Sequence, residues 1–198
     1  MSEIANNKTT PSYSSSKTVN LVFIAMMTAV VCVLGPIAIQ IPISPVPISL
    51  GTLGLYTVIY ILGWKKALAS CALYLLIGLT GAPVFTGFTG GIAKLFGPTG
   101  GYLIGYLPMA ALIGFFLKKF KKKWLQFIGY ILGTAVLYTF GTIWLAIMND
   151  IRFIDALWAG VIPFIPGDIA KIMIAMILGP LVRKALNRAS LMMEDDSF

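Results

Sequence analysis

Histidine is absent from this sequence, cysteine occurs only twice, and the phosphate-binding motif GxxxxGK does not occur. Without histidine, His-based acid–base catalysis is excluded and zinc sites lose one of their main ligands. Cys32 and Cys71 lie in apolar runs with no Cys or His neighbour, which is typical of small buried hydrophobic side chains. Hydrolysis of ATP by a Walker-type mechanism is also excluded. Since no nucleophile–base pair or metal cluster is recognisable, we expect neither an enzyme nor a bound cofactor.

Charged residues are scarce as well. They make up 11% of the 198 residues, whereas hydrophobic residues make up 58%, and the mean hydropathy is +0.90. An ordinary soluble domain has about 25% charged residues. A chain with so little charge cannot cover a water-facing surface, so the composition predicts an integral membrane protein surrounded by the lipid bilayer. The length requires only one domain.

Six apolar segments are candidates for membrane-spanning helices. They cover residues 19–41, 48–62, 67–79, 102–117, 125–148 and 167–186. We therefore expect an all-α integral membrane domain over 18–187, preceded by a disordered cytoplasmic lead at 1–17 and followed by a cytoplasmic tail at 188–198. Residues 151–161, between the last two spans, are expected to form a short amphipathic helix at the membrane surface.

The net charge of +8 is distributed unevenly between the two sides of the predicted membrane domain. If the N-terminus is cytoplasmic, twelve basic residues fall on the inner side, namely Lys8, Lys17, Lys65, Lys66, Lys118, Lys119, Lys121, Lys122, Lys123, Arg183, Lys184 and Arg188. Only Lys94 and Arg152 fall outside, and Lys171 lies within a span. This bias predicts a multi-pass cell-membrane protein with both termini in the cytoplasm. Basic residues confined to short gaps between apolar segments do not indicate a nucleic-acid partner.

Three unusual segments then lie on the outer side. They are the proline-rich loop 42–47, the glycine-rich loop 81–101 and the Pro-Gly-Asp sequence at the start of the last span. Lipid offers no hydrogen bonds, so non-helical backbone near membrane depth has to be buried in protein or line a cavity. The glycine-rich loop also carries apolar side chains. We therefore expect this loop to fold back onto the helices as a lid or pocket wall. The alternative, which stays open, is a tight turn that needs glycine only for its dihedral angles.

Asp168 and Lys171 lie in the first turn of the last span. A charge at the centre of a membrane helix costs about 2.5–3.5 kcal/mol on insertion scales and indicates a functional site. An acid at a helix N-terminus suits the helix dipole, whereas a lysine there opposes it. The spacing i, i+3 puts both side chains on one face. Two interpretations remain open: an ion pair that satisfies only itself, or a pair that also offers an acceptor and a donor to a polar ligand.

Four segments resemble, in order and spacing, the BioY family. They read "PVPISLGTLG", "YLLIGLTGAPVFTGFTGG", "LFGPTGGYLIGY" and "IPGDIAK", and the similarity covers about residues 18–186. Members of this family are biotin-binding membrane subunits, or S components, of energy-coupling factor (ECF) transporters. One position departs from the family pattern, because Gly51 stands where a glutamine is expected.

The resemblance implies six transmembrane helices with a loop-capped biotin pocket at the outer face. It also implies a role in high-affinity vitamin uptake, energised by a transmembrane coupling (T) subunit and two ATPase subunits. The family's small-residue pattern for docking onto the coupling subunit corresponds to Ala25 and Ala29. The alternatives are a related subunit for another small vitamin and a proton-coupled transporter that acts alone, with Asp168 as the proton carrier.

Biotin carries a ureido ring, a thioether ring and a valeryl carboxylate. We expect Asp168 to accept a ureido N–H and Lys171 to donate to the ureido carbonyl or to hold Asp168 ionised. The carboxylate is expected near Lys94 or the backbone amides of the glycine-rich loop, at Thr89, Gly90 and Gly91. The apolar part of the ligand is expected to rest on Phe85, Phe88, Tyr138 or Trp144.

Overall fold

The computed structural model describes residues 17–40, 42 and 46–188, and it is mostly helical. The elements are α1 (Lys17–Leu34), β1 (Ala38–Ile39), β2 (Ile48–Ser49), α2 (Gly51–Leu79), α3 (Ile92–Leu95), α4 (Gly100–Lys119), α5 (Lys123–Asn149), α6 (Phe153–Gly160), the 3-10 helix η2 (Ile162–Phe164) and α7 (Ile165–Arg188). Of the predicted lead at 1–17 and the predicted tail at 188–198, residues 1–16 and 189–198 lie outside the described residues, whereas Lys17 and Arg188 are the ends of α1 and α7. The short helix expected within 151–161 is present as α6, and its place at the membrane surface stays a prediction.

Helix α1 ends earlier than the sequence suggested. The prediction extended the first span to residue 41, but the helix stops at Leu34, and residues 38–39 form β1, which pairs antiparallel with β2. The physical reason is Gly35-Pro36, since a residue that precedes proline disfavours the helical region. The expectation of a purely helical fold is corrected to this extent, because β1 and β2 form a small two-stranded sheet.

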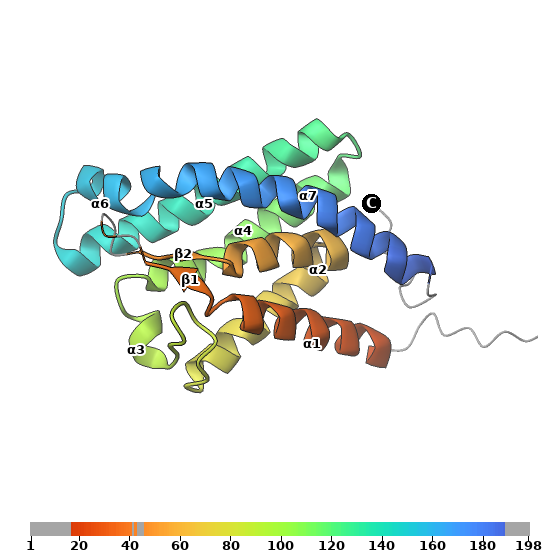
Figure 1. Ribbon diagram of the computed structural model, residues 1–198, viewed down its shortest axis with the longest axis horizontal. Helices are drawn as coiled ribbons and strands as arrows, with labels where there is room; N and C mark the ends of the chain where they lie inside the picture. The colour runs from red at the N-terminus through yellow and green to blue at the C-terminus, as the bar shows by residue number, and fades with distance from the viewer. Residues whose placement is uncertain (1–16, 41, 43–45, 189–198) are drawn as a thin grey trace, which may run out of the picture.

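A sharp bend divides α2 into two arms. Gly63 lies at φ 73° and ψ 171°, a conformation that residues with a side chain rarely adopt. The bend falls in the sequence GWKK, where a gap between two spans was predicted. In Figure 1 the second arm of α2 returns toward the end of the molecule from which the first arm started.

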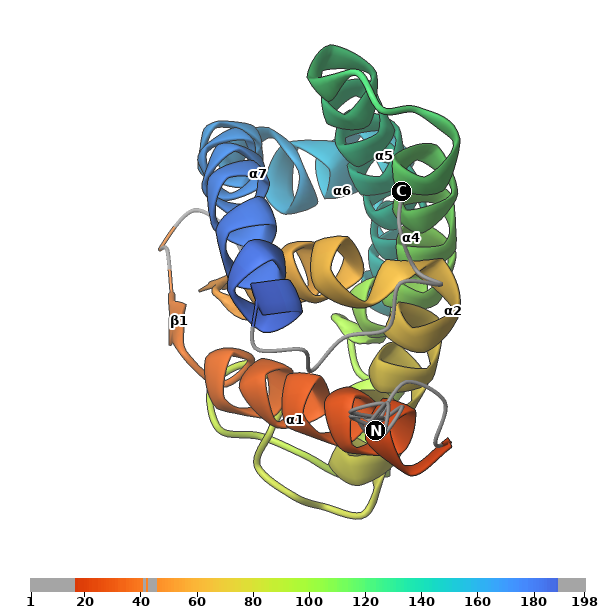
Figure 2. The same ribbon diagram turned by 90° about the vertical axis from the view of Figure 1, so that its right-hand side faces the viewer.

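Among the described residues, four helical stretches are long and apolar enough to cross a membrane, namely Gly51–Leu79, Gly100–Lys119, Lys123–Asn149 and Phe153–Arg188. Thr18–Leu34 is a shorter apolar helix. The long helices run between two ends of the molecule (Figure 1). The strand end holds β1, β2, α3 and α6. The basic end holds the first turn of α1, the bend of α2, the α4–α5 turn and the last turns of α7, and Figure 2 looks onto it.

Polar side chains inside the bundle are paired across helices. The Tyr56 hydroxyl lies 2.7 Å from Thr134 Oγ1, and the Tyr130 hydroxyl donates to the Tyr56 carbonyl at 3.0 Å. The rings of Tyr56 and Tyr130 also pack edge to face, with centroids 5.5 Å apart. Since lipid cannot satisfy such groups, these bonds allow α2 and α5 to carry hydroxyls in an apolar setting. They hold together two of the helices that build the site.

Candidate functional site

A cavity lies at the strand end of the bundle. Its lining consists of Val46, Pro47, Ser49, Thr52, Thr86, Lys94, Thr99, Tyr102, Leu103, Tyr106, Leu137, Tyr138, Gly160, Phe164, Asp168 and Lys171. The space open to the centres of water-sized molecules is about 60 Å³. One water needs about 10–15 Å³ by that measure. The cavity is therefore much larger than a packing defect.

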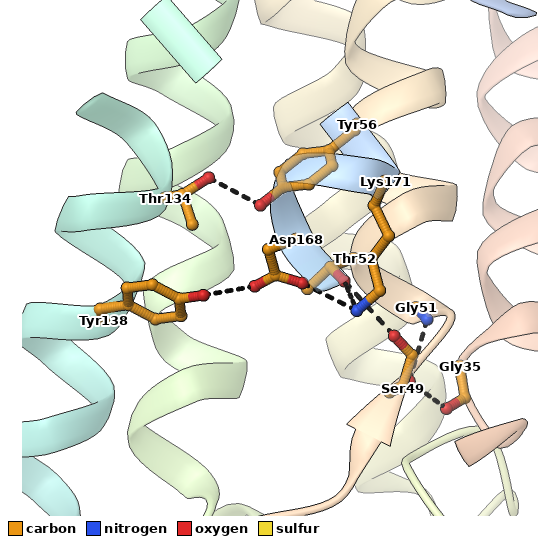
Figure 3. Close-up of polar contacts among 9 residues, drawn as sticks. All are labelled: Gly35, Ser49, Gly51, Thr52, Tyr56, Thr134, Tyr138, Asp168 and Lys171. Atoms are coloured by element: carbon orange, nitrogen blue, oxygen red, sulfur yellow. Dashed lines mark hydrogen bonds and ion pairs between the residues drawn. The ribbon is translucent and has the colours of Figure 1, made fainter. Parts of the chain in front are cut away.

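Asp168 and Lys171 meet in this cavity (Figure 3). Lys171 Nζ lies 2.8 Å from Asp168 Oδ1, and the two residues are only 7% and 5% exposed respectively. The Tyr138 hydroxyl of α5 donates to Asp168 Oδ2 at 2.7 Å, and Lys171 Nζ donates to Thr52 Oγ1 of α2 at 3.0 Å. Three helices thus fix one ion pair.

This arrangement leaves binding capacity on both charges. An ammonium has three N–H donors, and Lys171 uses two of them, on Asp168 and Thr52. A carboxylate can accept about four hydrogen bonds, and each Asp168 oxygen receives one. The pair is therefore neutralised but not saturated, which favours the interpretation that it offers an acceptor and a donor to a ligand.

Lys94 of α3 lines the same cavity. Within the described part of the chain, its ammonium has no hydrogen-bond or salt-bridge partner. Burial lowers the pKa of Lys94 below its ordinary value. Together with Lys171 and Asp168 it gives the lining two cations and one anion, an excess that suits an anionic ligand.

Ser49 connects the two segments that close the cavity beside α2. Its hydroxyl donates to the Gly35 carbonyl at 2.8 Å and accepts from the Gly51 amide at 2.9 Å. A Cβ placed on Gly51 would lie 3.1 Å from Ser49 Oγ and 3.2 Å from Gly35 Cα. This close approach gives a physical reason for glycine at position 51, where the family pattern led us to expect glutamine.

Of the ten residues predicted to contact the ligand, four line the cavity: Asp168, Lys171, Lys94 and Tyr138. Phe85 does not, because its ring is fully buried against Tyr74, with centroids 5.5 Å apart, and fills the space above Gly78. Phe88 is 70% exposed, at φ 57°, and also lies outside the lining.

The three predicted backbone contacts of the glycine-rich loop lie outside the lining too. The amide of Thr89 donates to the Phe85 carbonyl, and the amide of Gly91 donates to the Gly78 carbonyl at 2.7 Å. Gly90 packs against the carbonyl of Ala82 so closely that a Cβ would clash. The amides of Thr89 and Gly91 are therefore used within the protein, and the charged residue that the loop brings to the cavity is Lys94.

Trp144 lies behind the wall rather than in it. Its indole N–H donates to the Gly97 carbonyl at 2.9 Å, and its ring packs on Phe96 with centroids 6.5 Å apart. Gly100 and Gly101 allow this close approach, since a Cβ on either would clash with the backbone or with Trp144 itself. Trp144 therefore fixes the glycine-rich loop against α5.

Sequence reasoning missed several polar residues of the lining, among them Thr52, Thr86, Tyr102 and Tyr106. Tyr102 also donates to the Gly160 carbonyl at 2.8 Å and so holds the end of α6 at the cavity. For Thr52, Tyr102 and Tyr106, a hydroxyl within an apolar span was the available signal. It is weak, because a hydroxyl on a helix often bonds to its own backbone, as Thr57 does with the Leu53 carbonyl.

The predicted docking residues Ala25 and Ala29 lie on the exposed face of α1. Large apolar side chains share that face, including Val22, Met26 and Val33. Small residues four apart allow close approach of another helix. In this chain the face is open to a neighbour.

Comparisons with known proteins identify related membrane proteins. The family model described as the BioY family matches residues 6–188. Biotin transporter BioY2 of Lactococcus lactis subsp. cremoris is 38% identical over 177 residues, which is 89% of this chain and 96% of the relative. Biotin transporter BioY of Thermotoga maritima is 34% identical over 147 residues, 74% of this chain and 86% of the relative.

Among solved structures, the crystal structure of the S-component for biotin from an ECF-type ABC transporter has a similar fold, with a TM-score of 0.79. It is 35% identical in sequence, and the match covers 85% of this chain and 92% of the other. The motifs, the helical fold and these matches agree: the chain belongs to the BioY family.

Proposed function

We propose that this chain is the biotin-binding S component of an ECF-type vitamin transporter. The observation that carries the proposal is the unsaturated Asp168–Lys171 pair, buried in a cavity at one end of a membrane bundle. The names of the two relatives compared above, both biotin transporters, and of the similar solved structure supply the ligand class.

In the proposed complex, the ureido ring of biotin lies against the ion pair. Asp168 accepts a ureido N–H through a free lone pair, and Lys171 donates its third N–H to the ureido carbonyl. Tyr138 and Thr52 hold the two charges in place through their present hydrogen bonds. Each polar edge of the ring thus has a hydrogen-bond partner, without which it would be buried unsatisfied.

The carboxylate of biotin is proposed to pair with Lys94. Lys94 is the cation of the lining with no partner among the described residues, and it lies on a different segment from Asp168 and Lys171. A ligand that spans from α7 to α3 would place a polar group at each end. The apolar middle of biotin would contact Leu103, Leu137 or Phe164 of the lining.

We also propose six membrane crossings, with the two arms of α2 counted separately. Lys17 and Arg188, the first and last described helical residues, then lie on one side of the membrane together with the basic loops. The distribution of charge supports a cytoplasmic location for that side. The strand end, with Lys94 and Arg152, would face outward.

Energy for uptake is proposed to come from other chains. The sequence lacks a Walker A motif, so the chain itself does not hydrolyse ATP by a Walker-type mechanism. The resemblance to the BioY family implies a coupling subunit and two ATPase subunits as the partners that supply the energy. The exposed face of α1 that carries Ala25 and Ala29 is the proposed docking surface for the coupling subunit.

Equilibrium binding to detergent-purified protein tests this function. Asp168→Asn should weaken biotin binding by about 1.5–3 kcal/mol, which is the usual contribution of a hydrogen bond to a charged group. Asp150→Asn, a matched change outside the cavity, should leave the affinity unchanged. Unaltered affinity of the Asp168→Asn variant would remove this residue from the binding site, and transport by the chain alone that depends on a proton gradient would favour the carrier alternative.

A further inference from the structure

The basic end carries a concentration of positive charge that the proposed function does not use. Five of the six residues from 118 to 123 are lysines, and all five are exposed. Within residues 17–40, 42 and 46–188 there are three acidic residues, Asp150, Asp155 and Asp168. All three belong to the α5–α6 turn, α6 or the first turn of α7, at the opposite end of the molecule (Figure 1).

Aromatic rings lie among these lysines. Lys119 Nζ is 5.6 Å from the ring centroid of Phe115 and 5.6 Å from that of Phe120. Such cation–π contacts hold the ammonium near the helix surface, at the edge of an apolar ring. Trp124, the residue after Lys123, is 60% exposed, and Phe115 is 52% exposed.

The bend of α2 extends this surface. Lys65 Nζ lies 5.5 Å from the Trp64 ring centroid, so the same combination of lysine and aromatic ring recurs there. A Cβ on Gly114 of α4 would clash with Trp64, so the bend packs directly on α4, one helical turn before Lys118. Figure 2 shows the bend of α2 and the α4–α5 turn along one edge of the bundle, with α4 between them. We call Lys65, Lys118, Lys119, Lys121, Lys122 and Trp124 the basic patch.

We propose that the basic patch binds the phosphodiester head groups of anionic phospholipids in the cytoplasmic leaflet. Lysines near such a leaflet each contribute about 1 kcal/mol of attraction, and aromatic rings favour the depth between head groups and acyl chains. In this surface the exposed ammonium groups can contact the lipid head groups while the exposed rings lie between the head groups and the acyl chains. An acidic protein surface would match the ammonium groups but would offer no apolar layer to Trp124 and Phe115.

The binding of these lipids anchors the turn between α4 and α5 and the bend of α2 at the membrane surface. The proposal depends on the orientation given above but not on the identity of the vitamin. Biotin affinity, measured on the same samples, therefore tests the proposed function separately.

The experiment uses the full chain, purified and reconstituted into nanodiscs of phosphatidylcholine with increasing fractions of phosphatidylglycerol. Native mass spectrometry then measures the ratio of the two lipids retained. The double variant Lys118→Gln/Lys119→Gln removes two charges from the basic patch. We expect it to lower the preference for phosphatidylglycerol by about thirtyfold, since two interactions of about 1 kcal/mol each are lost and 1.4 kcal/mol corresponds to a factor of ten. High salt should reduce the preference of the wild-type chain.

The double variant Lys184→Gln/Arg188→Gln is the matched control, because it removes two charges from the same end of the molecule but outside the basic patch. It should lower the preference clearly less. An equal loss in both double variants would show a general effect of net charge and would overturn the proposal. The same conclusion would follow if the wild-type chain retained both lipids in proportion to their supply.

Discussion

Replacement of Lys171 by methionine should destabilise the protein strongly. The change removes the counter-ion of a carboxylate that is 5% exposed and leaves Asp168 with the Tyr138 hydroxyl as its one remaining side-chain donor among the described residues. Two charges 2.8 Å apart attract each other by about 6 kcal/mol at an effective dielectric constant of 20. Partial relaxation and water entry reduce this value, and the loss of one partner of a buried pair typically costs about 3–5 kcal/mol.

The assay is thermal unfolding in detergent, without biotin, for three variants measured side by side. Lys171→Met should lower the unfolding midpoint by roughly 6–20 °C, if 1 kcal/mol corresponds to roughly 2–4 °C in a chain of this size. The double variant Asp168→Asn/Lys171→Met should recover much of that loss, because no uncompensated charge remains. Lys184→Met, which removes an exposed lysine of the same helix, should change the midpoint little.

Equal midpoints for Lys171→Met and the wild-type chain would refute this reasoning, since they would mean that water solvates Asp168 in the folded protein. A double variant less stable than Lys171→Met alone would refute it as well. In that case the two side chains would contribute independently rather than as a pair.

Three further predictions concern the walls of the cavity. Burial lowers the pKa of Lys94, and a carboxylate ligand binds its charged form, so biotin affinity should be full at neutral pH and fall as the pH rises through that lowered pKa. Isothermal titration calorimetry should show this decline below pH 10.5, the ordinary value, and Lys94→Gln should abolish it. Trp144→Phe removes the hydrogen bond to Gly97, worth about 0.5–1.5 kcal/mol, and should speed hydrogen exchange in residues 92–99; unchanged exchange would show that the loop is fixed elsewhere. Gly51→Gln should weaken biotin binding, because the added side chain presses on Ser49, and an affinity equal to wild type would show that the backbone at Gly35 yields easily.

Much of the membrane domain could be predicted because the relevant signals are local. A run of apolar residues long enough to cross a bilayer indicates by itself that the segment lies in the membrane. The interruptions at GWKK and KKFKKK coincide with the bend of α2 and the α4–α5 turn. Where local signals conflicted, the prediction was wrong. Residues 35–41 are apolar enough to continue a helix, but Gly35-Pro36 ends α1 at Leu34.

Part of the candidate site was also predictable. Asp168 and Lys171 are charges in an apolar run, three positions apart on one helix, so their pairing needs only helical geometry. The glycine-rich loop misled the prediction in detail. Its glycines suggested free amides near a ligand. In the folded loop the amide of Thr89 donates to Phe85, the amide of Gly91 donates to Gly78 of α2, and Phe85 is buried in the core.

By itself, the sequence determined the medium and the charges: an apolar chain, basic at its loops, with a carboxylate and an ammonium one helical turn apart. The tertiary structure decided what surrounds those charges. Thr52 lies 119 positions from Lys171 and Tyr138 lies 30 positions from Asp168, yet both reach the pair. Such contacts depend on how α2, α5 and α7 pack, and packing is a property of the whole bundle. For that reason hydropathy could indicate that the two charges belong to a functional site, but only the fold shows which side chains hold them and which hydrogen-bonding positions they leave unused.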